Sequence, residues 1–381
     1  MHTLCTVQSE EHIEAIRESV SFCATVFRFC VHGVRVFSRK LKSLTVESFT
    51  MAPKNPVMNV VASPEDAGTL DTDLENTPYP AGYQQEQKRP PPQIVWRNVM
   101  LMCLLHLVSV YALLFTVWKC KMYTLVWTVF LYFLTGLGIT AGAHRLWAHR
   151  SYKAKLPLRT FLGMCQTMAF QNDIYDWARD HRVHHKFSET DADPHNALRG
   201  FFFAHVGWLL VKKHPDVCES GKKLDFSDLM EDPIVRIQRK FYLPFVLLFC
   251  FIIPSYVPTY WGESAMNAYL VCGLLRYCLN LNATWLVNSA AHMWGQHPYD
   301  YTIQPAENPF VTTLALGEGW HNYHHVFPND YRTGEFGWRI NPTSIFIDVM
   351  AWFGQVTDRK LIAPNVILAR KQRTGENNHC D

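Results

Sequence analysis

The sequence predicts an all-α membrane protein in which four transmembrane helices carry a cytosolic helical cap. Three observations support this fold class. Four long apolar segments occur along the chain, positive charges concentrate in one of the loops between them, and clusters of histidine fall on the side of that loop. The cap is therefore expected to hold a histidine-rich metal site.

The four apolar segments are each long enough to cross a bilayer. At ~1.5 Å per residue, a helix of about 20 residues spans a hydrocarbon core of ~30 Å. Buried helices of a soluble protein are the alternative, but such long runs with so few charges are rare in soluble proteins. Only His106 interrupts the first segment, and only Arg276 the fourth. The predicted spans are residues 99–118, 122–143, 241–260 and 265–291.

Lysines and arginines predict the orientation of these spans. Residues 261–264, between the third and fourth spans, carry no positive charge, and the turn between the first two carries only Lys119 and Lys121. The long middle loop carries many, so we expect it to be cytosolic. Four spans then place both termini in the cytosol, with a cap formed by residues 144–240 and 292–375. Residues 345–356 are apolar but contain Asp348, which favours an amphipathic helix resting on the membrane or on the cap.

The ends of the chain differ from this large domain. Residues 51–93 are polar and rich in proline, which is typical of a disordered leader. Residues 1–50 form either an upstream extension or a short amphipathic anchor helix. The chain thus divides into an N-terminal extension and leader (1–93), one large domain (94–375) and a tail (376–381).

Composition excludes several classes of protein. The net charge of +3 predicts no nucleic-acid partner. The 11 cysteines include no Cys-x-x-Cys pair, and several lie in apolar runs. A disulfide framework is therefore not expected, and a reducing compartment fits better.

Histidine is the unusual residue of this sequence. There are 18, and half of them gather near the predicted cytosolic ends of the spans. A lone histidine is usually structural, whereas clusters with ligand-like spacing on one side of a membrane indicate a metal site. The candidate ligands are His144, His149, His181, His184, His185, His292, His321, His324 and His325.

Helix geometry predicts how these histidines divide. Residues four apart share a helix face, so His181 and His185 are expected to bind one metal. His184 points about 100° away from His185 and suits a second metal. The same His-x-x-His-His pattern recurs in the third cluster and offers the same division. His144 and His149 are five residues apart, so they need a helix end or a wider turn to converge.

The number of imidazoles predicts two metals. Nine exceed what one metal accepts, and a structural zinc site needs only four ligands. Imidazole also suits copper, iron and nickel. Asn288 lies one turn before His292 and is placed to hold a water on the less saturated metal. A membrane metal transporter is the alternative from another class, but its ligands would follow a path through the spans.

Six stretches surround the histidines: residues 138–147, 170–173, 177–182, 191–196, 288–292 and 317–325. They resemble the integral-membrane acyl-CoA desaturases of the stearoyl-CoA Δ9 type, and the aromatic-rich stretches resemble those of insect members. The resemblance covers about residues 95–373, nearly everything after the leader. It identifies the large domain as a desaturase domain.

The resemblance implies a multi-pass enzyme of the endoplasmic reticulum membrane with a di-iron site of two Fe²⁺ ions. Such an enzyme introduces a double bond, cis-Δ9, into a saturated fatty acyl-CoA. It uses O2 and electrons from cytochrome b5 and its NADH-dependent reductase, and membrane lipid surrounds it. A shifted position such as Δ11 and a fatty acyl hydroxylase stay open as alternatives. No side chain beyond the iron ligands and Asn288 is implied in catalysis.

The resemblance also implies individual roles. One iron would be held by His144, His149, His181, His185 and His325, and the other by His184, His292, His321 and His324, with Asn288 through water. The acyl-CoA head would lie near Asn98, Asn172, Arg179, Asp180, Lys212, Lys213 and Trp285. Cations suit the phosphates of CoA, with a solvated basic patch as the alternative for the two lysines. Tyr132, about 18 Å along a helix before His144, is a candidate end-stop for the acyl chain, with core packing as the alternative.

Overall fold

The computed structural model describes residues 91–335 and 341–376. The predicted leader up to residue 90, both hypotheses for residues 1–50 and the tail from residue 377 lie outside the described residues. At its two ends the described chain is joined to the body. The carbonyl of Gln93 accepts from the Lys212 backbone N–H at 2.9 Å, and the Glu376 N–H donates to the His297 carbonyl at 3.0 Å.

Four helical stretches are long and apolar enough to cross a membrane, as the sequence predicts. They are Trp96–Lys119, Met122–Ala148, Tyr242–Trp261 and Ala265–Met293. The second and fourth stretches run several residues beyond the predicted ends at 143 and 291. Their segments, with η marking 3-10 or π turns, are α2 (Trp96–Tyr111), η2 (Ala112–Thr116), η3 (Val117–Lys119), α3 (Met122–Leu137), η4 (Gly138–Ala148), α10 (Tyr242–Val246), η7 (Leu247–Ile252), α11 (Ile253–Tyr256), η8 (Val257–Trp261), α12 (Ala265–Ala268), η9 (Tyr269–Leu275), α13 (Arg276–Asn288) and α14 (Ala290–Met293).

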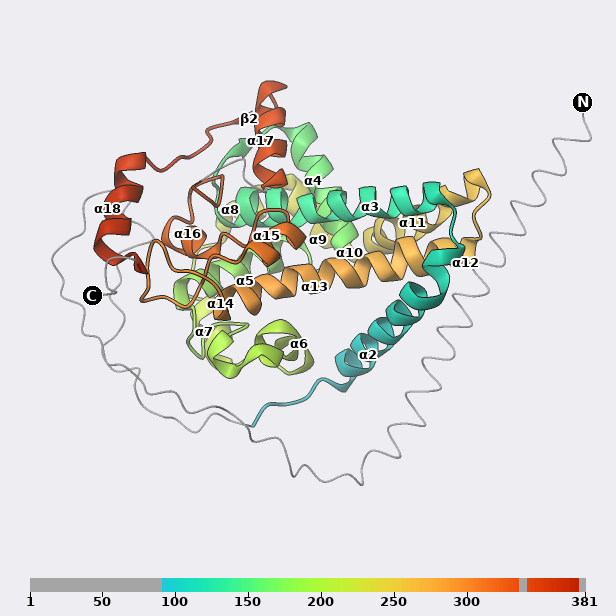
Figure 1. The fold of residues 1–381 in the computed structure, drawn as a ribbon, viewed down its shortest axis with the longest axis horizontal. Helices are drawn as coiled ribbons and strands as arrows, with labels where there is room; N and C mark the ends of the chain where they lie inside the picture. Colours follow the sequence, from blue (N-terminus) through green and yellow to red (C-terminus); the bar gives the residue numbers. More distant parts are fainter. Residues whose placement is uncertain (1–90, 336–340, 377–381) are drawn as a thin grey trace, which may run out of the picture.

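The remaining elements form a helical cap at one end of the spans (Figure 1). They are β1 (Lys153–Ala154), α4 (Leu156–Ala169), α5 (Ile174–Phe187), η5 (Ala197–Arg199), η6 (Phe203–Gly207), α6 (Trp208–Leu210), α7 (Pro215–Gly221), α8 (Ser227–Glu231), α9 (Pro233–Lys240), α15 (Pro309–Leu314), α16 (His321–Val326), α17 (Pro342–Trp352), β2 (Val356–Thr357) and α18 (Pro364–Thr374). The strands β1 and β2 pair antiparallel, with Lys153 opposite Thr357. The fold is therefore all-α apart from one short two-stranded sheet among the described residues.

The second and fourth spans extend into the cap. Figure 1 shows α3 and α13 running side by side from the far end of the bundle into the cap. The main apolar cluster of the cap joins η4 to α4, α5, α8, α9 and α17. At Gly138 the η4 and α4 backbones approach so closely that a Cβ would lie 2.3 Å from the Cys165 carbonyl carbon. The cap is thus packed rigidly on the second span, which positions its side chains.

Arg276 is fully buried within the fourth span. Its guanidinium and Nε donate to the carbonyls of Cys272, Met168 and Cys250 and to the Thr135 hydroxyl. These partners belong to the second, third and fourth spans and to α4. No carboxylate among the described residues pairs with this cation. A charge in this position is costly unless such partners surround it, so Arg276 ties four elements together.

The apolar segment that the sequence predicts to be amphipathic is α17. Thr343, Ser344 and Ile347 are buried against the cap, whereas Ile345 and Val349 are largely exposed. Trp352 at its end is 81% exposed. The helix therefore rests on the cap with one face and presents an apolar face to its surroundings.

Candidate metal centre

The nine predicted histidines converge at the cap end of the bundle into two groups. The first, called the five-histidine group, consists of His144, His149, His181, His185 and His324. The second, called the four-histidine group, consists of His184, His292, His321 and His325. Within each group, the nearest ring nitrogens lie within 4.8 Å of one another, a spacing that fits a shared metal ion.

The spacing of five between His144 and His149 is resolved by a π-helical turn. Segment η4 is π-helical, and the His149 N–H donates to the His144 carbonyl five residues earlier at 3.0 Å. This wider turn places the two rings 4.8 Å apart between centroids. The sequence requires a helix end or a wider turn here, and the structure has the wider turn.

Helix α5 separates its three histidines between the groups as the spacing predicts. His181 and His185 face the five-histidine group, and His184 faces the other. The side chain of Asp173 caps the first turn of α5 by accepting from the Asp176 N–H at 2.8 Å, and the Trp177 ring stacks on His181 at 4.9 Å. As the N-cap residue, Asp173 fixes where α5 begins, and hence the direction in which each of its imidazoles points.

The division that the family resemblance implies is wrong for two residues of α16. It assigns His325 to the metal of His144 and His324 to the metal of His184. The structure exchanges them, because His324 Nε2 lies 2.9 Å from His144 Nε2, whereas His325 Nε2 lies 3.1 Å from His321 Nε2. The physical reason is the helix face. His321 and His325 are four residues apart and share one side of α16, and His324 points to the other.

The distances between neighbouring Nε2 atoms match those around a bound metal ion. His149 and His181 are 2.8 Å apart, and His321 and His292 are 2.9 Å apart. With metal–nitrogen bonds of about 2.1 Å, two nitrogens at right angles lie about 3.0 Å apart. Without an ion, packing so many nitrogens together in a buried site would be unfavourable. The donor set therefore fits two metal ions that accept imidazole ligands.

Three acidic side chains orient three of these imidazoles through their Nδ1 atoms. Glu318 Oε2 lies 2.9 Å from His144 Nδ1, Asp193 Oδ1 lies 2.9 Å from His184 Nδ1, and Glu189 Oε1 lies 2.8 Å from His292 Nδ1. An ionised carboxylate only accepts, so each Nδ1 carries the hydrogen and each Nε2 keeps its lone pair for a metal.

Most imidazoles of this cluster are held in the neutral form, which can bind a metal. Burial, together with the neighbouring imidazoles, lowers the pKa of His149, His181, His185, His321, His324 and His325 well below the usual range of histidine. These rings are neutral at pH 7, the form that binds metals. For His184, burial opposes the charged form, but the Asp193 carboxylate outweighs it and raises the pKa.

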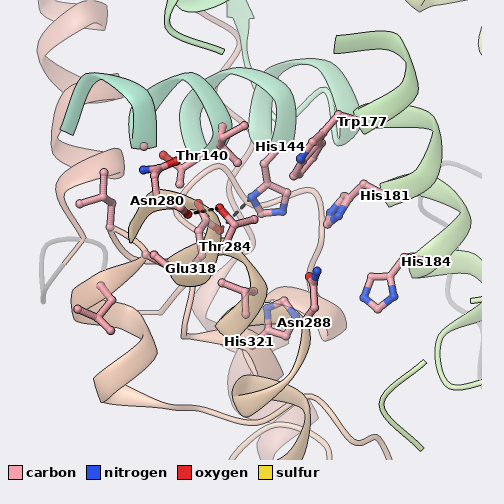
Figure 2. Close-up of a pocket in the computed structure, with 17 residues that line it drawn as sticks. Thr140, His144, Trp177, His181, His184, Asn280, Thr284, Asn288, Glu318 and His321 are labelled. Atoms are coloured by element: carbon pink, nitrogen blue, oxygen red, sulfur yellow. Dashed lines mark hydrogen bonds and ion pairs between the residues drawn. The ribbon is translucent and has the colours of Figure 1, made fainter. Parts of the chain in front are cut away.

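A cavity beside these groups lies between the second and fourth spans. Figure 2 shows that His144, His181, His184 and His321 line this cavity, with the Asn288 side chain beside them. The predicted water-binding residue Asn288 therefore lines the same space as members of both groups. The rest of the wall is mainly apolar, with Gly136, Ile139, Ala283, Val287, Leu314, Ala315 and Leu316.

Most of the predicted acyl-CoA residues lie in one region of the cap. The start of α2 pairs with residues 210–212 through Val95, whose N–H donates to the Leu210 carbonyl. The Asn98 amide donates to the Leu209 carbonyl at 2.7 Å. Asp180 forms ion pairs with both Arg179 and Lys213. Asn98, Arg179, Asp180, Lys212 and Lys213 are thereby linked through these contacts.

The other predicted substrate residues differ in burial: Trp285 is buried, Tyr132 is half-buried and Asn172 is exposed. Trp285 is 2% exposed and lies in the apolar cluster against which Leu209 and Phe170 pack. Asn172 follows Phe170 and adopts a left-handed backbone with φ 69°. Tyr132 is not among the residues that line the cavity. Its hydroxyl donates at 2.8 Å to the carbonyl of Leu314, which does line it. Tyr132 therefore stands one turn behind Gly136, outside the cavity wall.

Sequence reasoning missed the three orienting carboxylates. Asp193 and Glu318 lie within the stretches that carry the family resemblance, so a signal for them was present. Glu189 lies outside those stretches, and its role depends on a tertiary contact with α14.

These features define a class of protein: a four-span membrane protein whose cap holds two groups of histidines beside a mainly apolar cavity. Comparison with known proteins places it within that class. A family model described as fatty acid desaturase matches residues 121–333. The chain belongs to the fatty acid desaturase family.

Named relatives cover most of the chain. Stearoyl-CoA desaturase 5 of Bos taurus is 61% identical over 284 residues, 74% of this chain and 84% of the relative. An acyl-CoA desaturase of Cyprinus carpio is 56% identical over 329 residues, 86% of this chain and 99% of the relative. Stearoyl-CoA desaturase of Homo sapiens is 56% identical over 309 residues, 81% of this chain and 86% of the relative.

Proposed function

We propose that this protein is an acyl-CoA desaturase, an oxidoreductase that introduces a double bond into a saturated fatty acyl-CoA with O2 as the oxidant. The observation that carries the proposal is that members of both histidine groups line a mainly apolar cavity between two spans. An acyl chain in this cavity has methylenes, rather than a polar group, beside the metal ligands. The names of the relatives agree with this substrate class.

The metals are two iron ions in this proposal. The five-histidine group would hold one, and the four-histidine group, with Asn288 through water, the other. The all-nitrogen donor set suits iron among other metals, and the resemblance to the acyl-CoA desaturases implies iron. When bound, the iron pair supplies the activation of O2 that removal of hydrogen from an unactivated methylene requires.

The chain's own residues bind, align and shield the substrate. The apolar wall formed by Ile139, Val287 and Leu316 holds the acyl chain and excludes water. Arg179, Lys212 and Lys213 supply positive charge for the phosphates of CoA at the cap surface. A solvated basic patch is the alternative for the two lysines, and the KM of Lys213→Ala for acyl-CoA separates the alternatives. Rigid alignment of one methylene pair is the main contribution of the protein.

We further propose a cis-Δ9 product, electrons from cytochrome b5 and its NADH-dependent reductase, and placement in the endoplasmic reticulum membrane. Both termini are cytosolic in this proposal, because the cap holds the excess of positive charge and both described ends of the chain lie against it.

The test is expression of the full chain in cells that lack their own fatty acyl desaturase, followed by mapping of the double bond. We expect a cis-Δ9 monounsaturated product, which His184→Ala and His324→Ala each abolish while the protein stays in the membrane. A Δ11 alkene would revise the position, and a hydroxylated product would replace desaturation by hydroxylation. Metal accumulation without a modified fatty acid would favour transport.

A further inference from the structure

The two histidine groups differ in the charge that surrounds them. In the described part of the chain, the carboxylate that orients an imidazole of the five-histidine group is Glu318, and its charge is neutralised. Glu318 contacts His144 with one oxygen, and its other oxygen accepts from Arg145 Nε at 3.1 Å and from a terminal guanidinium nitrogen of Arg145 at 2.9 Å. Glu318 and Arg145 together add no net charge. Burial of both side chains makes this pairing strong.

The four-histidine group has two orienting carboxylates and no such cation. Asp193 accepts from His184, and Glu189 accepts from His292. Among the described residues, neither carboxylate forms an ion pair with a lysine or arginine. Asp193 is 4% exposed, accepts from the backbone N–H groups of Glu189 and His195, and lies 3.5 Å from the Nδ1 of His195. Two negative charges thus stand directly behind the group that has fewer imidazoles.

Both carboxylates come from one short loop that follows α5, residues 188–196. The loop closes on itself, because the Thr190 carbonyl accepts from the Asp193 N–H at 3.0 Å and from the Asn196 amide at 2.8 Å. Glu189 has a left-handed backbone with φ 58°, which an L residue rarely adopts. This conformation aims Glu189 at His292 on α14, far along the chain. A strained residue in such a contact indicates a functional constraint.

We propose that Glu189 and Asp193 are positioning residues that specifically control the metal of the four-histidine group. A carboxylate behind Nδ1 increases the basicity of Nε2 and offsets the charge of a bound cation. The loop thereby compensates for one imidazole fewer in this group. The inference rests on the proposed two-metal site, and it assigns to each metal its own set of supporting residues.

The test uses the full chain, purified in detergent and loaded with Fe²⁺. The readouts are iron ions per chain and the rate at which an Fe²⁺ chelator removes them. The informative variant is Glu189→Gln, because glutamine keeps an oxygen acceptor for His292 and removes only the charge. Asp193→Asn tests the second carboxylate. Glu307→Gln controls for the substitution of a buried carboxyl as such, because Glu307 accepts from the Tyr323 N–H at 2.7 Å and not from an imidazole.

In wild type and in Glu307→Gln we expect two ions that leave slowly. In Glu189→Gln and Asp193→Asn, one of the two ions should leave about 10- to 100-fold faster. X-ray absorption of the ion that stays should count five imidazoles, not four. Release of both ions at wild-type rates from Glu189→Gln would overturn the inference, as would equal acceleration of both. Fewer than two ions in the wild type would instead defeat the two-metal proposal.

Discussion

The His149 N–H donates to the His144 carbonyl at 3.0 Å and closes a turn one residue wider than that of an α-helix. In a regular α-helix, residues five apart point about 140° away from each other. In the π-helical η4 the two rings instead share one face, 4.8 Å apart between centroids. The five-histidine group depends on this backbone irregularity.

Removal of one of these rings should disable the site. We expect His149→Ala to lower desaturation at least ~100-fold and to reduce bound iron, because ligands on the same metal act as a unit. His297→Ala is the control, since His297 belongs to neither group. Iron content and product yield measure the outcome. Full iron occupancy in His149→Ala would contradict the assignment of this ligand.

The cationic region should act on binding and not on chemistry. Lys213 pairs with Asp180, which also pairs with Arg179. We expect Lys213→Ala to raise KM for acyl-CoA about 10-fold with kcat nearly unchanged, because a charge-assisted contact contributes about 1.5–3 kcal/mol. Initial rates over a range of acyl-CoA concentrations give both constants.

Lys222→Ala serves as the comparison for that experiment, because Lys222 is exposed and pairs only locally with Glu219. An acyl-pantetheine substrate, which lacks the nucleotide phosphates, should show little difference between Lys213→Ala and wild type. An unchanged KM for acyl-CoA would identify the two lysines as a solvated patch.

Tyr132 should limit the length of the acyl chain that the cavity accepts, through its contact with the cavity-lining residue Leu314. Its hydroxyl holds the Leu314 carbonyl, so Tyr132→Ala removes both the ring and this bond. We expect the preferred acyl chain to lengthen in Tyr132→Ala, whereas Tyr132→Phe keeps the ring and the wild-type preference. Competition between acyl-CoA substrates of different length measures the effect. If Tyr132→Ala leaves the preference unaltered, the residue serves core packing alone.

Glu307 should make the stability of the cap depend on pH. Burial raises the pKa of this carboxyl from 4.5 to about 8. Between these values the folded state binds more protons than the unfolded state, so stability falls as pH rises. Thermal melting from pH 5 to pH 9 should show a declining Tm for wild type and a flatter profile for Glu307→Gln. Glu219→Gln, at an exposed position, should keep the wild-type slope, and equal slopes in all three proteins would refute the role of Glu307.

Local patterns made the spans and the ligands predictable. Hydropathy located the four spans within a few residues, and the rule that residues four apart share a helix face separated His184 from His181 and His185. The same rule also divides His321, His324 and His325 correctly. The division implied by the family resemblance is wrong there, so direct geometric reasoning was the better guide at α16.

Tertiary contacts were not predictable from local patterns. Glu189 contacts His292 across 103 positions of the chain, and Glu318 contacts His144 across 174. Periodicity describes one element at a time and carries no information on which loop approaches which helix. The spacing of His144 and His149 required a helix end or a wider turn. The sequence did not show which of the two occurs, because the π-helical turn of η4 depends on its packing against α4.

The buried Arg276 constrains how the protein is made. A lone helix with an arginine near its centre meets a cost of about 2.5–3.5 kcal/mol on insertion into a bilayer. The groups that relieve this cost, Thr135, Cys250 and Met168, belong to chain that is synthesised earlier. The fourth span is therefore stabilised when the preceding spans are already assembled to receive Arg276. Biogenesis is expected to proceed in order along the chain, with the fourth span as the segment that closes the bundle.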